Sequence, residues 1–323
     1  MEIAASRPNR TSASTDMGGT FDEAGVGGFG LEALGFRLRA SDMAPRTVRR
    51  SMKPVDVVRV GPLHDARERR QDVAAAEEPL EIRLQGSTFV VTMRTPGADR
   101  ELAVGLLVSE RVIAGPEDIG TIRHCGGATD EGAENLLDVM LVGAAAVRAE
   151  AALGGRRLVT TTSACGVCGR RSIDELMQDV PPVTGRWAMA AAVVAALPGR
   201  LRGGQTLFDE TGGLHAAGLF DRHGTPVAVA EDVGRHNAVD KVVGAQLLGE
   251  RWPLPDLALF VSGRTSFEIV QKAVVAGIPI VGAVSAPSSL AIELARAAGV
   301  TLLGFVRDDT FNIYTGEERV AGR

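Results

Sequence analysis

The feature that most constrains the fold is a regular alternation of apolar runs and helical segments after Pro226. The runs are short and rich in branched apolar residues, and each helical segment ends near a glycine, as helices commonly do. The apolar runs cover residues 225–233, 257–262, 278–286 and 300–307, and the helical segments cover residues 237–248, 265–277 and 288–299. This pattern predicts an α/β fold with a largely parallel sheet covered on both faces.

The first half of the chain follows a different pattern. Residues 80–94 alternate apolar and polar side chains around a Gly-Ser pair, which predicts a β-hairpin. A helical period follows over residues 95–113, and an apolar run over residues 135–142 adds a strand. We therefore expect a small α+β domain over residues 55–150.

The two ends of the chain complete the expected organisation. Residues 1–45 are rich in Gly, Ser and Ala without a sustained apolar period, which is typical of a disordered extension. A second methionine, Met43, is an alternative start site. A further strand is expected at residues 157–163, and the α/β domain is expected to span residues 156–323.

Composition limits where the protein acts and what it binds. A net charge of −5 gives no basic footprint for nucleic acid, and no apolar run approaches the roughly 18 residues that a membrane helix needs. The N-terminus lacks the apolar core of a signal peptide, and three cysteines cannot form an even set of disulfides. We expect a cytoplasmic protein with reduced cysteines and no nucleic-acid or membrane partner.

Three predicted strand-to-helix loops carry groups that bind anions. They read EDVGRHNAVDK, SGRTSFE and SAPSS, and in the second loop Thr265 and Glu268 have the spacing of a capping box. Ligands of open α/β sheets bind beyond the carboxyl ends of the strands, where free N–H groups of helix N-termini can hold phosphate oxygens. No Walker A loop or dinucleotide fingerprint is present, so a nucleotide that forms part of a larger cofactor is the expected ligand.

Two of the three cysteines, Cys165 and Cys168, form an isolated C-x-x-C followed by Gly169, Arg170 and Arg171. Three interpretations are compatible with this pattern: a zinc site completed by other ligands, a thiol-disulfide oxidoreductase, and a carrier of sulfane sulfur. The arginines and a helix that we expect to begin just beyond them would favour a thiolate, which is the form that accepts sulfur.

The motif TGGLHAAG contains a candidate functional histidine, His215. Zinc deaminases carry H-x-E followed later by P-C-x-x-C. Ala217 stands where the glutamate would be, and the C-x-x-C precedes the histidine, so we expect no deaminase chemistry.

From about Arg59 to its C-terminus, the chain resembles the accessory sulfurtransferases of formate dehydrogenase (FdhD type). The resemblance depends on RTPGADRELAVGLLVSE, the C-x-x-C, TGGLHAAG, EDVGRHNAVDK, SGRTSFEIVQKAVVAGIPIVGAVSAP and LLGFVRDDTFNIYTG. It implies a homodimer with a three-layer αβα, cytidine-deaminase-like C-terminal domain. It also implies a sulfurtransferase that receives sulfur from a cysteine desulfurase and passes it to the molybdenum or tungsten bis(molybdopterin guanine dinucleotide) cofactor of formate dehydrogenase.

The resemblance assigns roles to particular residues. Cys165 would carry the persulfide, and Cys168 would be its partner. No metal ligand is assigned, and GDP is a possible analogue of the cofactor. Together with the loops described above, the residues that we expect to bind the cofactor are His215, Arg235, His236, Gly263, Arg264, Thr265, Phe305, Val306, Arg307, Asp308, Asp309 and Thr310. Phe305 would stack on a flat ring, while Arg307 would pair with phosphate.

Overall fold

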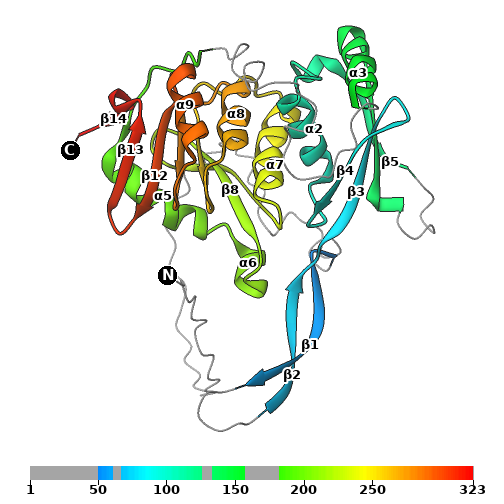
Figure 1. Ribbon diagram of the computed structural model, residues 1–323, viewed down its shortest axis with the longest axis horizontal. Coiled ribbons are helices and arrows are strands. Elements are labelled where there is room, and N and C mark those ends of the chain that lie inside the picture. Colours follow the sequence, from blue (N-terminus) through cyan, green and yellow to red (C-terminus); the bar gives the residue numbers. More distant parts are fainter. Residues whose placement is uncertain (1–49, 61–66, 126–132, 157–181, 323) are drawn as a thin grey trace, which may run out of the picture. The chain divides into compact units, whose positions relative to one another are not determined.

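The computed structural model describes residues 50–60, 67–125, 133–156 and 182–322. The expected extension at residues 1–45, the expected strand at 157–163 and the C-x-x-C with its expected helix start lie outside these ranges. Within the described residues, the protein is a mixed α/β structure with two main sheets (Figure 1).

The larger sheet has six strands in the order β13-β12-β11-β10-β8-β9. The strands are β8 (His215–Phe220), β9 (Pro226–Asp232), β10 (Ala258–Val261), β11 (Ile280–Ala283), β12 (Thr301–Arg307) and β13 (Thr310–Thr315). All four strands predicted after Pro226 are confirmed. The expectation of a largely parallel sheet is wrong, because only the β10–β11 and β11–β12 pairs are parallel and the other three are antiparallel.

The antiparallel pairs come from two strands that the sequence pattern did not predict, β8 and β13. Each forms a hairpin with a predicted strand: β8 with β9, and β13 with β12. The sequence of β8, HAAGLF, gives a weak strand signal because the residues at its centre, Ala, Ala and Gly, have small side chains or none. Gly218 is required there, since a Cβ at this position would lie 2.6 Å from the Phe220 ring.

Helices cover both faces of the six-stranded sheet (Figure 1). Side chains from α7 (Arg235–Leu248), α8 (Phe267–Val275) and α9 (Ser289–Ala298) share one apolar cluster with Leu259 and Val261 of β10. Side chains from α5 (Ala191–Arg202) share a second cluster with Ala258 and Phe260 of the same strand. Successive strand residues point to opposite faces, so this alternation explains why the strands are apolar throughout.

The smaller sheet has four strands in the order β4-β3-β6-β5. The strands are β3 (Glu78–Leu84), β4 (Ser87–Arg94), β5 (Ile119–His124) and β6 (Leu136–Leu141), with helices α2 (Asp99–Ser109) and α3 (Gly143–Arg156). The predicted hairpin is confirmed as β3–β4, and its turn residues Gln85 and Gly86 both have positive φ. Helix α2 packs against α7, and residues of the two sheets belong to one apolar cluster.

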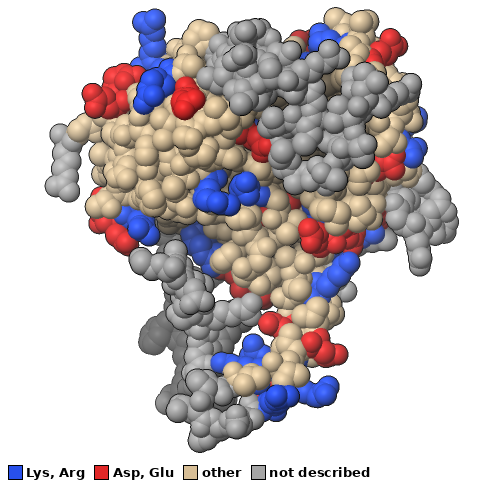
Figure 2. Space-filling model, viewed as in Figure 1, with Lys and Arg blue, Asp and Glu red and all other residues tan. Residues whose placement is uncertain are grey.

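Shorter elements complete the described structure. They are β1 (Met52–Val60), β2 (Arg67–Ala75), β7 (Met189–Ala190), α6 (Thr206–Thr211), β14 (Val320–Ala321) and the 3-10 helices η1 (Pro116–Asp118), η2 (Ala133–Asn135) and η3 (Glu317–Arg319). Strands β1 and β2 pair only with each other among the described strands. On the face drawn in Figure 2, both signs of charge are scattered over the described surface. Among the described helices, none has the length and apolar character needed to cross a membrane.

Candidate functional site

The three predicted anion-binding loops meet at one edge of the six-stranded sheet. Strands β9, β10, β11 and β12 run in the same direction, so their carboxyl ends and the first residue of antiparallel β8 share this edge. Hydrogen bonds join the loops: His236 Nε2 of the first lies 3.1 Å from Ser266 Oγ of the second, Thr265 N of the second donates to Ala286 O of the third over 3.2 Å, and Phe305 N at the end of β12 donates to Ser285 O over 3.2 Å. The expected convergence of these loops is therefore confirmed.

His215 begins β8 and lies beside the loop that follows β10. A Cβ added to Gly263 would lie 3.3 Å from His215 Nδ1, so glycine permits this close approach. Burial lowers the pKa of His215, and the neighbouring Arg235 and His236 lower it further, whereas Asp232 opposes them. These surroundings favour the neutral imidazole, and an approaching anion would oppose them by favouring its protonation.

Helix α7 begins with Arg235 and His236, after Gly234 at the N-cap. None of the described side chains caps this end of α7, so its first N–H groups are available to an anion. Nε of Arg235 is buried and has no hydrogen-bond partner among the described residues. The start of α7 thus presents both the free N–H groups of a helix N-terminus and a guanidinium donor without a partner among the described residues.

His236 is held by the start of α8. Its Nε2 lies 2.8 Å from a carboxylate oxygen of Glu268 and 3.1 Å from Oγ of Ser266. The predicted capping box is wrong: Ser266 is the N-cap of α8, and Glu268 pairs with His236. Thr265 is 1% exposed, and its Oγ1 has no hydrogen-bond partner among the described residues. Arg264 is exposed beside it.

The segment predicted to contact the cofactor forms the end of β12 and the turn into β13. Phe305 has a φ of 52° at a break in strand register, and Asp308 and Asp309 have φ values of 49° and 61°. Two successive central residues with positive φ are typical of a type I′ hairpin turn. In this turn, Oγ1 of Thr310 donates to the carbonyl of Arg307 over 3.0 Å.

The side chains of this segment are not equally accessible. Val306 is fully buried in the cluster that includes α5, so its side chain is directed into the core. Arg307 is exposed, and its guanidinium carbon lies 5.8 Å from the centroid of the half-buried Phe305 ring. Phe305 and Arg307 therefore form an aromatic and cationic pair at the same sheet edge.

A cavity of about 810 Å³ adjoins His215. Its described lining comes from α5, α6, the TGGLHAAG motif and the ends of β9, β10 and β11. At this cavity, Arg202 stacks over the Phe208 ring with its guanidinium carbon 4.6 Å from the ring centroid. The cavity is large enough for part of a nucleotide-sized ligand.

The described residues include the cysteine Cys125 but no cluster of side chains that could bind a metal ion. Cys125 is a free, half-buried thiol that follows β5, and its N–H donates to the carbonyl of Leu136. Within the described ranges, no three His, Cys, Asp or Glu side chains gather in a way that could hold a metal ion. Cys165 and Cys168, assigned from the resemblance, lie outside those ranges, so their roles stay a prediction.

Sequence reasoning did not assign Asp232 or Lys241, which form a buried ion pair with an N–O distance of 2.7 Å behind the start of α7. Both lie within the EDVGRHNAVDK motif. The available signal was charge at positions where the apolar pattern predicts burial, since charged side chains are almost never buried unless they are paired.

Comparison with known proteins places the chain in a family. The model of the FdhD/NarQ family matches residues 75–321. The chain is 54% identical over 257 residues to the sulfur carrier protein FdhD of Anaeromyxobacter dehalogenans, covering 77% of this chain and 89% of that protein. It is 52% identical over 268 residues to the sulfur carrier protein FdhD of Nocardia farcinica, covering 82% of this chain and 93% of that protein.

A solved structure has the same fold. It is a protein from Desulfotalea psychrophila assigned as a formate dehydrogenase accessory protein, and it matches with a TM-score of 0.65 at 24% identity. The match covers 84% of this chain and 99% of that one. Because the family model spans most of the described chain and the relatives match over most of their own length, this chain belongs to the FdhD/NarQ family.

Proposed function

We propose that this protein is a sulfur carrier that serves formate dehydrogenase. The observation that carries the proposal is about 50% identity, over most of their length, to relatives named sulfur carrier protein FdhD. The proposed donor is a cysteine desulfurase. The proposed acceptor is the molybdenum or tungsten bis(molybdopterin guanine dinucleotide) cofactor, which the protein binds as a substrate.

The chemistry is the transfer of one sulfane sulfur atom. The Cys165 thiolate attacks the terminal sulfur of the donor's cysteine persulfide, a new S–S bond forms on Cys165, and the donor leaves as a thiolate. The second transfer passes that terminal sulfur to the cofactor. If Cys168 attacks the inner sulfur of Cys165, a Cys165–Cys168 disulfide forms and the terminal sulfur leaves as hydrosulfide.

The sheet edge supports binding of the cofactor's phosphates. Arg235 Nε and Thr265 Oγ1 are buried donors without partners among the described residues, and leaving such a group unpaired costs about 1–3 kcal/mol. Phosphate oxygens would accept hydrogen bonds from these groups and from the uncapped end of α7. Phe305 and Arg307 would bind a ring and a phosphate at the same edge.

The finer expectations belong to this proposal. We propose a cytoplasmic homodimer that acts as a sulfurtransferase, with residues 156–323 forming a cytidine-deaminase-like αβα domain. Helices on both faces of the six-stranded sheet are compatible with this layering. The His215 environment, with Ala217 two residues later, gives no support to deaminase chemistry.

Mass spectrometry of the intact protein and of its peptides tests the carrier role. After incubation with a cysteine desulfurase and cysteine, the peptide that contains Cys165 should gain sulfur atoms that a reductant removes, because a persulfide is an S–S bond. Cys165→Ala should lose the adduct and fail to activate formate dehydrogenase, whereas Cys125→Ala should retain both abilities. Stoichiometric zinc in the purified protein, without a sulfur adduct under any donor condition, would contradict the proposal and favour a metal-stabilised binding module.

A further inference from the structure

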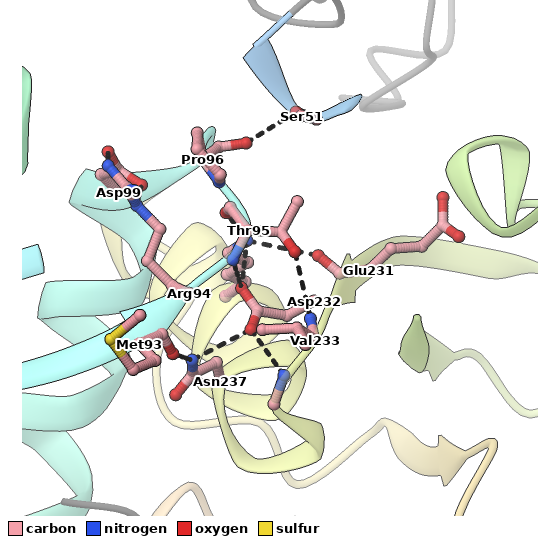
Figure 3. Close-up of polar contacts among 12 residues, drawn as sticks. Ser51, Met93, Arg94, Thr95, Pro96, Asp99, Glu231, Asp232, Val233 and Asn237 are labelled. Carbon is pink, nitrogen blue, oxygen red and sulfur yellow. Dashed lines mark hydrogen bonds and ion pairs between the residues drawn. The ribbon is translucent and has the colours of Figure 1, made fainter. Parts of the chain in front are cut away.

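Two segments that are far apart in sequence are joined by one buried carboxylate. Asp232, at the end of β9, is fully buried and faces the residues that follow β4 (Figure 3). Its Oδ2 accepts a hydrogen bond from Thr95 N over 3.1 Å and lies 2.7 Å from Lys241 Nζ. Its Oδ1 accepts from Gly234 N over 2.8 Å and from Asn237 Nδ2 over 3.0 Å.

The residues after β4 bind back to the same loop (Figure 3). Thr95 Oγ1 accepts a hydrogen bond from Val233 N over 3.2 Å, and Thr95 O accepts one from Lys241 Nζ over 2.9 Å. Asn237 Nδ2 also donates to Met93 O over 2.8 Å. We call Thr95, Asp232, Asn237 and Lys241 the Asp232 network. It fixes the backbone of the loop from both sides.

The loop held by the Asp232 network leads directly into the candidate site. Gly234 is the N-cap of α7, and Arg235 and His236 are its first two residues. Asp232 accepts from the N–H of Gly234 and therefore does not occupy the N–H groups of the helix itself. A Cβ on Gly234 would lie 3.0 Å from Asn237 Nδ2, so the loop is also packed too closely for a larger residue to enter freely.

We infer that Asp232 and Thr95 are positioning residues, which set the start of α7 so that Arg235 and His236 face the cofactor's phosphates. This inference rests on the proposed function for its ligand, but its geometry depends only on the contacts above. It also gives a role to the RTPG motif, which begins at Arg94 and had no assigned function. In this inference, the motif acts on the site through the loop that it holds.

A purely structural role for the same ion pair makes a different prediction. Breaking any buried ion pair destabilises a protein, because it leaves a buried charge without its partner. A structural pair would therefore lower stability and leave the ligand affinity of the folded protein unchanged. A positioning network would change affinity even when stability is restored.

The experiment compares four variants of the full chain with the wild type. Asp232→Asn removes the charge and replaces one of the two carboxylate acceptors with an NH₂ donor. Asp232→Asn/Lys241→Met removes both charges of the pair, so no buried charge is left without a partner, but the lost acceptor is not restored. Thr95→Val removes one acceptor at nearly constant shape. Asp99→Asn is the matched control, because Asp99 forms a largely buried bidentate pair with Arg94 but, among the described residues, makes no hydrogen bond to the loop before α7.

Two measurements are made on each variant: GDP affinity by calorimetry at a temperature where the protein is folded, and hydrogen exchange of residues 233–240. We expect Asp232→Asn and the double variant to bind GDP at least tenfold more weakly, with faster exchange in this segment. Thr95→Val should weaken binding about threefold. Asp99→Asn should melt earlier but retain wild-type affinity within twofold and unchanged exchange in the segment.

The outcomes separate this inference from the proposed function. Wild-type affinity and wild-type exchange in the double variant would overturn the positioning role. If the wild type does not bind GDP, the proposed nucleotide site fails, and hydrogen exchange alone then decides whether the network orders the start of α7. Unchanged exchange in Asp232→Asn and in the double variant would overturn the inference in that case as well.

Discussion

Replacing Gly105 with alanine tests how closely α2 and α7 pack. A Cβ at Gly105 would lie 2.0 Å from the carbonyl oxygen of Asp240, and a Cβ at Gly244 would lie 2.0 Å from the carbonyl oxygen of Glu101. The two glycines thus bring the helix backbones into direct contact. Ordinary contact begins near 3.4 Å, so the added methyl group requires the helices to separate by about 1.4 Å.

The energy follows from that separation. Overpacking against a backbone atom costs about 1–3 kcal/mol or more, and the better helix propensity of alanine returns only up to about 1 kcal/mol. Because the α2–α7 contact lies within the apolar cluster that joins the two sheets, the cost should lie at the upper end of this range, and we expect a net loss of about 2 kcal/mol. The melting temperature should fall by roughly 4–8 °C, at about 2–4 °C per kcal/mol.

Urea unfolding followed by circular dichroism measures this loss. Gly154→Ala is the matched control, because Gly154 is also helical but an added Cβ would meet nothing within 4 Å. That variant should be unchanged or more stable by up to about 1 kcal/mol. If Gly105→Ala unfolds within about 0.5 kcal/mol of the wild type, the close approach of α2 and α7 does not exist as described.

Two further predictions concern the site. Because the pKa of His215 is lowered in the folded protein, the unfolded chain takes up the proton at a higher pH, and the free energy of unfolding should fall as pH drops below about 6.5 towards the folded-state pKa. His215→Gln should reduce the dependence of that free energy on pH in unfolding experiments between pH 5 and 7. An identical pH dependence would contradict the assignment. Arg307→Ala should weaken GDP binding by about 1.5–3 kcal/mol, or roughly ten- to a hundredfold in calorimetry, if its guanidinium pairs with a phosphate. The control variant Arg222→Ala, in the exposed turn between β8 and β9, should bind GDP with wild-type affinity. If the wild type binds GDP and ADP equally well, the site does not recognise guanine.

Local signals identified most of the larger sheet and its helices. The apolar runs that became β10, β11 and most of β12 are buried on both faces, and the run that became β9 is largely half-buried, so their composition alone indicated strands. The helices between them ended near their predicted glycines. The convergence of the loops at one edge also followed from the sequence, because consecutive strand-helix-strand units turn the carboxyl ends of their strands to the same side.

The direction of the remaining strands required the tertiary structure. Strand pairing depends on which segments meet, and β8 carries a glycine and two alanines that give little local signal. Its place between β9 and β10 is set by antiparallel pairing with both of those strands, which depends on backbone hydrogen bonds to segments outside β8. The sequence likewise predicted a local role for Glu268, as part of a helix cap. In the structure, Glu268 instead pairs with His236 of another helix.

The sequence by itself determined the apolar periods, the turn residues and the motifs that place the chain in its family. Only the tertiary structure decided how the site is supported. Asp232 and Thr95 are 137 residues apart, and Thr95 and Lys241 are 146 residues apart. A buried carboxylate requires partners, but no local period indicates which distant segment supplies them, because hydrogen bonds of this kind form only once the two sheets have packed together.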